Sequence, residues 1–153
     1  GLPSHALDMT AVLGNAAQQH AVVQAALQWA KPWLAQSPVL VYSTADAQDV
    51  KHTQTTLGSE VTGARVEQAL SAIAKGLVAL GVQQLVVAGG ETSGACVQAL
   101  GVQQMQIGGQ IDPGVPWCHA HAAAAGKDLH LALKSGNFGG ADFFSKAFTL
   151  LEH

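Results

Sequence analysis

Two glycine-rich segments hold most of the residues in this sequence that could carry chemistry. The first consists of Gly89, Gly90, Glu91, Thr92, Ser93 and Gly94. It lies between the apolar run Leu85 to Ala88, which predicts a buried strand, and a helical pattern from about Ser93 to Leu100. Because the first N–H groups of a helix lack partners and glycine admits a ligand to the backbone, this order predicts a phosphate-binding turn.

The hydroxyl groups of this turn leave two interpretations open. Thr92 and Ser93 can donate to a phosphate oxygen, or either can cap the helix in a tight turn that binds no ligand. No Gly-Lys-Ser/Thr follows, so the turn is not a Walker A loop. The spacing also differs from GxGxxG, which counts against a dinucleotide fingerprint.

The second glycine-rich segment follows the apolar run Leu131 to Leu133. It consists of Lys134, Ser135, Gly136, Asn137, Phe138, Gly139 and Gly140. Lys134 can supply a cation, Asn137 can hydrogen-bond a polar edge of a ligand, and Phe138 can pack on it. Since α/β proteins bind ligands where strands end, the two segments can face one crevice, one on phosphates and the other on a base or ribose. The alternative is a flexible loop with a solvated lysine.

Other reactive residue types have weaker support. Cys96 falls near the start of the helix, where a thiol pKa can fall, but no base is positioned near it, which favours a small packed residue. His119 and His121 alternate with alanine and can share a strand face, yet no third zinc ligand stands at a typical spacing, which favours an exposed pair. Asp142 stands near a helix start, where a capping role is favoured over a catalytic one.

Apolar patterns predict the elements that position these segments. The expected helices cover Asn15 to Gln36, with a kink or restart at Pro32, Gly63 to Leu80, and about Ala141 to Leu150. The expected strands are Val39 to Tyr42, Leu85 to Ala88, Met105 to Ile107 and Leu129 to Leu133, with loops at Asp46 to Ser59 and Ile111 to Trp117. This alternation predicts an α/β, Rossmann-like fold with a layered, mostly parallel or mixed sheet and flanking helices.

The composition favours one compact domain. Of the 153 residues, 48% are apolar and 11% charged, with a net charge of −3, which is the opposite of a disordered chain. The lack of a basic run counts against nucleic-acid binding, and no apolar stretch reaches the roughly 20 residues that span a bilayer. Two cysteines without a CxxC pair predict a cytoplasmic setting. Leu151 to His153 resemble the start of a purification tag, so we expect the fold within residues 1–150.

Three blocks of the sequence together resemble the four-carbon acid sugar kinase family. They are Val86 to Gly94, Pro113 to Trp117 and Leu131 to Gly139, and their order and spacing match as well. The resemblance is strongest from about Val66 to Leu150. It implies the ATP-binding C-terminal domain of a two-domain kinase that phosphorylates a tetronate or 3-oxo-tetronate, with Mg²⁺ held largely by phosphate and water.

The same resemblance implies contacts for individual residues. Gly90 and the turn formed by Ser93, Gly94, Ala95 and Cys96 would touch the nucleotide, and Gly136 would touch it from the second segment. The sugar-acid domain and its catalytic base would lie outside this sequence, in a longer protein or a separate subunit. We then expect the chain alone to bind ATP or ADP weakly and not to phosphorylate sugar acids. The sequence leaves the oligomeric state open, a homo-oligomer included.

Two other functions remain open at this point. One is a non-catalytic nucleotide- or phosphate-binding domain, which would share the glycine-rich turn. The other is a small dinucleotide-binding oxidoreductase domain, against which stand the missing GxGxxG and the lack of an acidic ribose partner.

Overall fold

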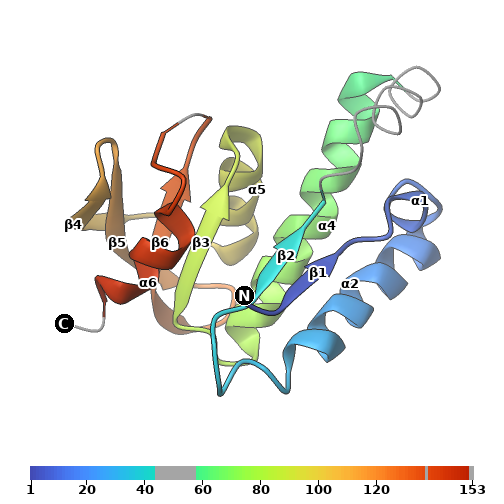
Figure 1. The fold of residues 1–153 in the computed structure, drawn as a ribbon. Coiled ribbons are helices and arrows are strands. Elements are labelled where there is room, and N and C mark those ends of the chain that lie inside the picture. Colours follow the sequence, from blue (N-terminus) through green and yellow to red (C-terminus); the bar gives the residue numbers. More distant parts are fainter. Residues whose placement is uncertain (44–57, 137, 152–153) are drawn as a thin grey trace. The chain divides into compact units, whose positions relative to one another are not determined.

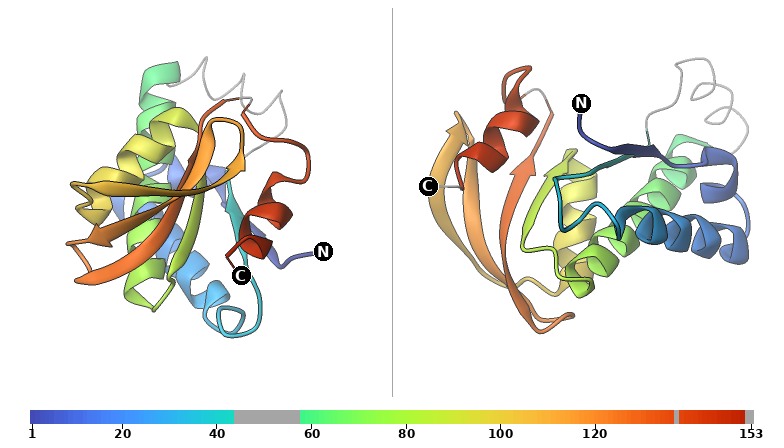
Figure 2. Two further views of the ribbon diagram at one scale, coloured as in Figure 1. Left: turned by 90° about the vertical axis from the view of Figure 1, so that its left-hand side faces the viewer. Right: turned by 60° about the horizontal axis from the view of Figure 1, so that its bottom comes forward.

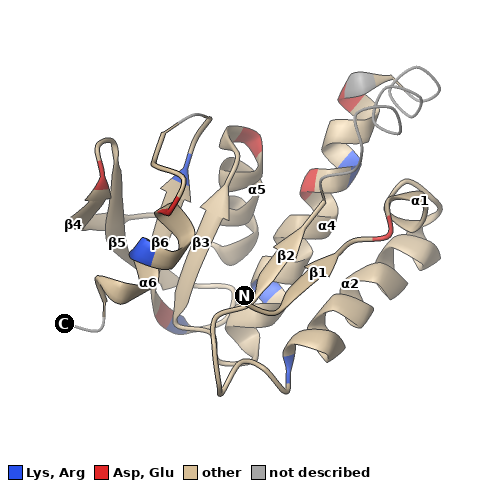
Figure 3. Cartoon of the chain, in the orientation of Figure 1, with Lys and Arg blue, Asp and Glu red and all other residues tan. Residues whose placement is uncertain are grey.

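The computed structural model of the chain describes residues 1–43, 58–136 and 138–151. The chain forms two compact units, Gly1–Ile73 and Ala74–His153. Most of the predicted loop at Asp46 to Ser59 lies outside the described residues. Within the described ranges, no helix is long and apolar enough to cross a membrane. Figure 3 shows charged positions scattered over the elements rather than gathered into one basic stripe.

The first unit pairs two short parallel strands with helices. Strands β1 (Ser4–Ala6) and β2 (Leu40–Tyr42) pair in parallel. The helices α1 (Met9–Val12) and α2 (Ala16–Ala30) lie between them in the sequence, and α4 (Ser59–Ala79) follows β2 and ends in the second unit. Asn15 begins α2 with a reciprocal capping box that involves Gln18. The prediction that this helix continues to Gln36 is wrong, because it ends at Ala30, ahead of Pro32.

The second unit is built on a four-stranded mixed sheet in the order β3-β6-β5-β4. Its strands are β3 (Gln84–Ala88), β4 (Met105–Asp112), β5 (Val115–Ala122) and β6 (Lys127–Lys134). Strands β3 and β6 are parallel, whereas the β4–β5 and β5–β6 pairs are antiparallel. The predicted α/β class with flanking helices is therefore confirmed (Figure 1). Of the two sheet types expected, mostly parallel or mixed, this sheet is mixed.

The loop predicted at Ile111 to Trp117 is instead the tip of a β-hairpin. Strand β4 runs to Asp112 and β5 begins at Val115, so only two residues connect them. Gly114 makes this turn with a φ of 83°, a value that other residues rarely adopt. The two prolines are the reason that the sequence predicted a loop here, because proline is uncommon within paired strands. In the structure Pro116 belongs to β5 and lies opposite Gln110 of β4.

Each face of this sheet is covered by helices of the same unit. One face packs on α5 (Gly90–Leu100) and the end of α4, in a cluster that includes Val78, Leu100 and Leu131. The other face packs on α6 (Phe143–Thr149), in a cluster that includes Trp117 and Phe143 (Figure 2). Helix α6 is shorter than the predicted Ala141 to Leu150, and Leu151 packs against the second cluster.

Candidate functional site

The two glycine-rich segments meet at one edge of the four-stranded sheet. Strands β3 and β6 are parallel with Ala88 opposite Lys134, so both end at the same edge and each is followed by a glycine-rich segment. The N–H of Gly89 donates to the carbonyl oxygen of Lys134 at 2.7 Å. A Cβ atom on Gly90 would lie 3.7 Å from Ser135 Oγ. The two segments therefore lie at one sheet edge, which a shared crevice requires.

Helix α5 begins at Gly90, three residues earlier than predicted. Gly89 is its N-cap, with φ 108° and ψ 130°, and no side chain caps the helix. The N–H of Ser93 donates to the carbonyl of Gly89 at 2.9 Å and closes the first turn. The N–H groups of Gly90, Glu91 and Thr92 precede that bond, so they have no partner within the helix. This turn presents three backbone donors together with the positive end of the helix dipole.

The backbone at the start of α5 is accessible. Gly90, Glu91 and Gly94 are exposed, while Thr92 and Ala95 are half-buried. A Cβ on Gly94 would meet nothing within 4 Å, and one on Gly90 would meet only Ser135 at van der Waals distance. A ligand oxygen therefore has room to reach the N–H groups of this turn.

Two side chains of the predicted site point into the protein instead. Ser93 is 7% exposed, and its Oγ is buried without a hydrogen-bond partner among the described residues. Cys96 is 1% exposed and lies in the second turn of α5, within the core cluster. Burial raises the pKa of the Cys96 thiol to about 11, which is the reverse of what a nucleophile needs and supports the packed interpretation.

Lys134 places a cation beside the second glycine-rich segment. Its Nζ donates to the carbonyl of Gly136 at 2.9 Å, which leaves further N–H donors on the ammonium group. Gly136 is exposed and has φ 52°, and a Cβ there would meet nothing within 4 Å. Asn137 lies outside the described residues. Phe138 presents an aromatic ring that is 55% exposed.

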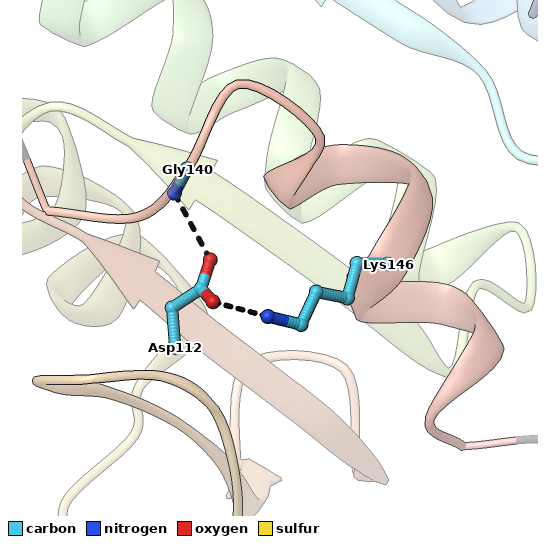
Figure 4. Close-up of polar contacts among 3 residues, drawn as sticks. All are labelled: Asp112, Gly140 and Lys146. Atoms are coloured by element: carbon cyan, nitrogen blue, oxygen red, sulfur yellow. Dashed lines mark hydrogen bonds and ion pairs between the residues drawn. The ribbon is translucent and has the colours of Figure 1, made fainter.

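Asp112, at the end of β4, joins the second segment to the hairpin and to α6. Its Oδ2 accepts a hydrogen bond from the N–H of Gly140 at 3.1 Å, and its Oδ1 pairs with Lys146 Nζ (Figure 4). The hydrogen bond from Lys146, and next that from Gly140, hold the pKa of the Asp112 carboxyl below its usual range. Sequence reasoning missed Asp112, since only the fold brings it to residues so distant along the chain.

The histidines of β5 lie apart from the glycine-rich edge. His119 and His121 are both exposed, as the exposed-pair interpretation requires. His121 Nδ1 lies 2.6 Å from Asp128 Oδ1, and the ring of His119 lies edge-on to that of His130 at 5.7 Å. Among the described side chains, no group of three or more His, Cys, Asp or Glu could hold a metal ion.

Several known proteins are similar to this chain. A 3-oxo-tetronate kinase of Burkholderia multivorans is 54% identical over 150 residues, which is 98% of this chain and 33% of the relative. A 3-oxo-tetronate kinase of Pseudomonas savastanoi pv. phaseolicola is 56% identical over 130 residues, which is 85% of this chain and 29% of the relative. The chain thus spans about a third of the length of these curated relatives.

Solved structures and a family model agree with this relationship. A crystal structure of a Haemophilus influenzae protein matches with a TM-score of 0.84 and 35% identity, over 97% of this chain and 34% of that one. The model of the family described as "Nucleotide-binding C-terminal domain" matches residues 2–144. The chain belongs to this family of nucleotide-binding C-terminal domains.

Proposed function

We propose that this chain is the ATP-binding part of a kinase that phosphorylates a four-carbon sugar acid. The observation that carries the proposal is the meeting of two glycine-rich strand ends at one sheet edge, with three N–H groups at the start of α5 that have no partner within the helix. The relatives named 3-oxo-tetronate kinase supply the reaction class and the substrate class.

The residues at this edge suit a nucleotide phosphate. The N–H groups of Gly90, Glu91 and Thr92 can donate to phosphate oxygens in the field of the helix dipole. The hydroxyl of Ser93 is buried and lacks a partner among the described residues, so the side chain would have to turn outward to donate to a phosphate oxygen. Lys134 adds a positive charge at the second segment, and Gly136 leaves that segment open to a ligand.

The other residues of the predicted site have supporting roles in this proposal. Gly89 holds the turn open by its positive φ, and Gly94 and Ala95 line the first turns of α5. Cys96 contributes packing beneath the turn. Asn137 stays a prediction for the base or ribose side.

When bound, ATP would supply the phosphoryl group that is transferred to a hydroxyl of the sugar acid. Such chemistry depends mostly on positioning and on stabilising charge, which is what backbone donors and one lysine provide. Mg²⁺ would be held largely by phosphate and water rather than by a protein cage. The sugar acid and the catalytic base would come from the part of the relatives that this chain does not span.

Calorimetric titration of the chain with ADP and with ATP, with and without Mg²⁺, tests the proposal. We expect binding to the native chain and its loss in Gly90→Val, because two methyl groups would cover the exposed N–H groups. Gly63→Val is the matched control, since Gly63 is also helical and open, with nothing within 4 Å of its added Cβ. A native chain that binds neither nucleotide, or a folded Gly90→Val that binds both, would contradict the proposal.

A further inference from the structure

Asp112 is a buried carboxylate whose two oxygens reach two different segments. Oδ2 accepts from the N–H of Gly140, in the second glycine-rich segment, and Oδ1 pairs with Lys146 of α6. The residue is 8% exposed, and a buried charge of this kind is stable only when it is paired and hydrogen-bonded. Both partners, Gly140 and Lys146, come after β6 in the sequence (Figure 4). Asp112 therefore links the β4–β5 hairpin to the part of the chain that follows β6.

The tip of the same hairpin makes a second contact with the segment. A Cβ on Gly114 would lie 2.9 Å from Cδ1 of Phe138, so the Phe138 ring rests directly on the Gly114 backbone. Only glycine satisfies both the positive φ and this close approach. The hairpin thus supports the segment at two places, Phe138 and Gly140.

The opposite end of the segment is held by the strand edge. Lys134 Nζ bonds the carbonyl of Gly136, and the carbonyl of Lys134 bonds the N–H of Gly89 in the first turn. Between these ends the segment contains three glycines, which restrict the backbone least of all residues. Its shape therefore depends on its anchors, and Asp112 is the charged one at the far end.

We infer that Asp112 is a positioning residue for the nucleotide, holding the second segment where it meets the base and ribose while the first turn holds the phosphates. This inference rests on the proposed function. The exposed Phe138 ring offers a stacking surface of the kind that bases use, and the segment carries no charge beyond Lys134. Among the described residues, the backbone hydrogen bond between the first turn and the segment joins the N–H of Gly89 to the carbonyl of Lys134.

The test compares two ligands on three variants of this chain. Asp112→Ala removes both bonds, and Asp112→Asn keeps an acceptor for the Gly140 N–H. Trp117→Phe removes a different hydrogen bond, to the carbonyl of Ala147 in α6, and leaves both groups that bond Asp112 in place. Each is titrated with Mg·ATP and with magnesium tripolyphosphate, which lacks base and ribose. We expect Asp112→Ala to weaken the binding of ATP at least tenfold and the binding of tripolyphosphate less than twofold. Asp112→Asn should recover most of the ATP affinity, and Trp117→Phe should bind both ligands as the native chain does.

Each other result has a separate meaning. If the native chain binds ATP and Asp112→Ala binds it equally well, the inference is wrong and the proposed function stands. Equal weakening of ATP and tripolyphosphate would overturn the assignment of the segment to the base and ribose. A native chain that binds neither ligand contradicts the proposed function and the inference with it. Should Asp112→Ala fail to fold, Lys146→Met, which keeps the Gly140 bond, must retain ATP binding, and its loss would overturn the inference.

Discussion

At the scale of single residues, Ser93 combines a buried position with a hydroxyl that lacks a partner among the described residues. An unsatisfied buried hydroxyl costs about 1–3 kcal/mol, so its removal should not destabilise the protein. We predict that Ser93→Ala keeps or raises the free energy of unfolding in urea, while ATP affinity falls roughly tenfold, as the loss of a hydrogen bond to a charged group implies.

The matched control for this substitution is Ser71→Ala. Ser71 is a helical serine of the first unit whose Oγ donates to the carbonyl of Gln68. The Ser71→Ala substitution should leave ATP binding unchanged. Unaltered ATP affinity in Ser93→Ala would show that the hydroxyl belongs to the core and not to the nucleotide site.

The hydrogen bonds of Asp112 predict that the stability of the fold depends on pH. Its hydrogen bonds lower the carboxyl pKa in the folded state, so the stabilisation is complete above the unfolded pKa of about 4 and is lost as the pH falls through the folded value. Asp112→Asn removes this contribution. The difference in melting temperature between the native chain and Asp112→Asn should therefore be largest near pH 7 and shrink toward pH 3. A difference that is constant across this range would contradict the assignment.

At the scale of elements, the buried strands were predictable because their residues are apolar on both faces. In β6, Leu131 and Ala132 are each 0% exposed, yet they belong to the clusters on opposite sides of the sheet. Such a strand has no polar face, so the run of apolar residues alone indicates it. Strand β3 is less buried, but Val87 packs in one cluster and Val86 against the other, so its apolar run also indicates a strand. The sequence was therefore sufficient to predict both strands that lead into the candidate site.

The hairpin and the start of α5 were not predictable for physical reasons. Pro113, Gly114 and Pro116 each disfavour a regular strand, whereas β5 is stabilised there by pairing with β4 and by the burial of Val115 and Trp117 against α6. Glycine is a poor helix former, so local propensity places the start of α5 after Gly90. The bond from Gly140 to Asp112 spans 28 residues, which no local pattern reports.

One buried hydrogen bond joins helix α6 to strand β5. Trp117 is 3% exposed, and its Nε1 donates to the carbonyl of Ala147 at 2.7 Å. Trp117→Phe leaves that carbonyl without its donor, which should lower the free energy of unfolding by about 1–3 kcal/mol. Urea unfolding followed by circular dichroism measures this. A variant as stable as the native chain would mean that this hydrogen bond adds nothing to the apolar contacts and the Lys146–Asp112 pair that hold α6.

At the scale of the whole molecule, the chain matches a nucleotide-binding C-terminal domain and spans about a third of its curated relatives. If the sugar acid and the catalytic base belong to the remaining length, this chain has nowhere to hold the second substrate. We predict that it binds nucleotide but forms no phosphorylated product from tetronate or 3-oxo-tetronate in a coupled ADP-release assay. Sustained turnover by this chain would overturn the division of labour that we propose.

The central claim is that the free N–H groups at the start of α5 hold the nucleotide phosphates. A ¹H–¹⁵N correlation spectrum of the labelled chain, recorded while Mg·ADP is added, tests it most directly because it observes those groups themselves. We predict that the amide signals of Gly90, Glu91 and Thr92 shift most, followed by those of Gly136 and Gly140. Shifts that are absent, or that gather instead around β1 and α2, would contradict it.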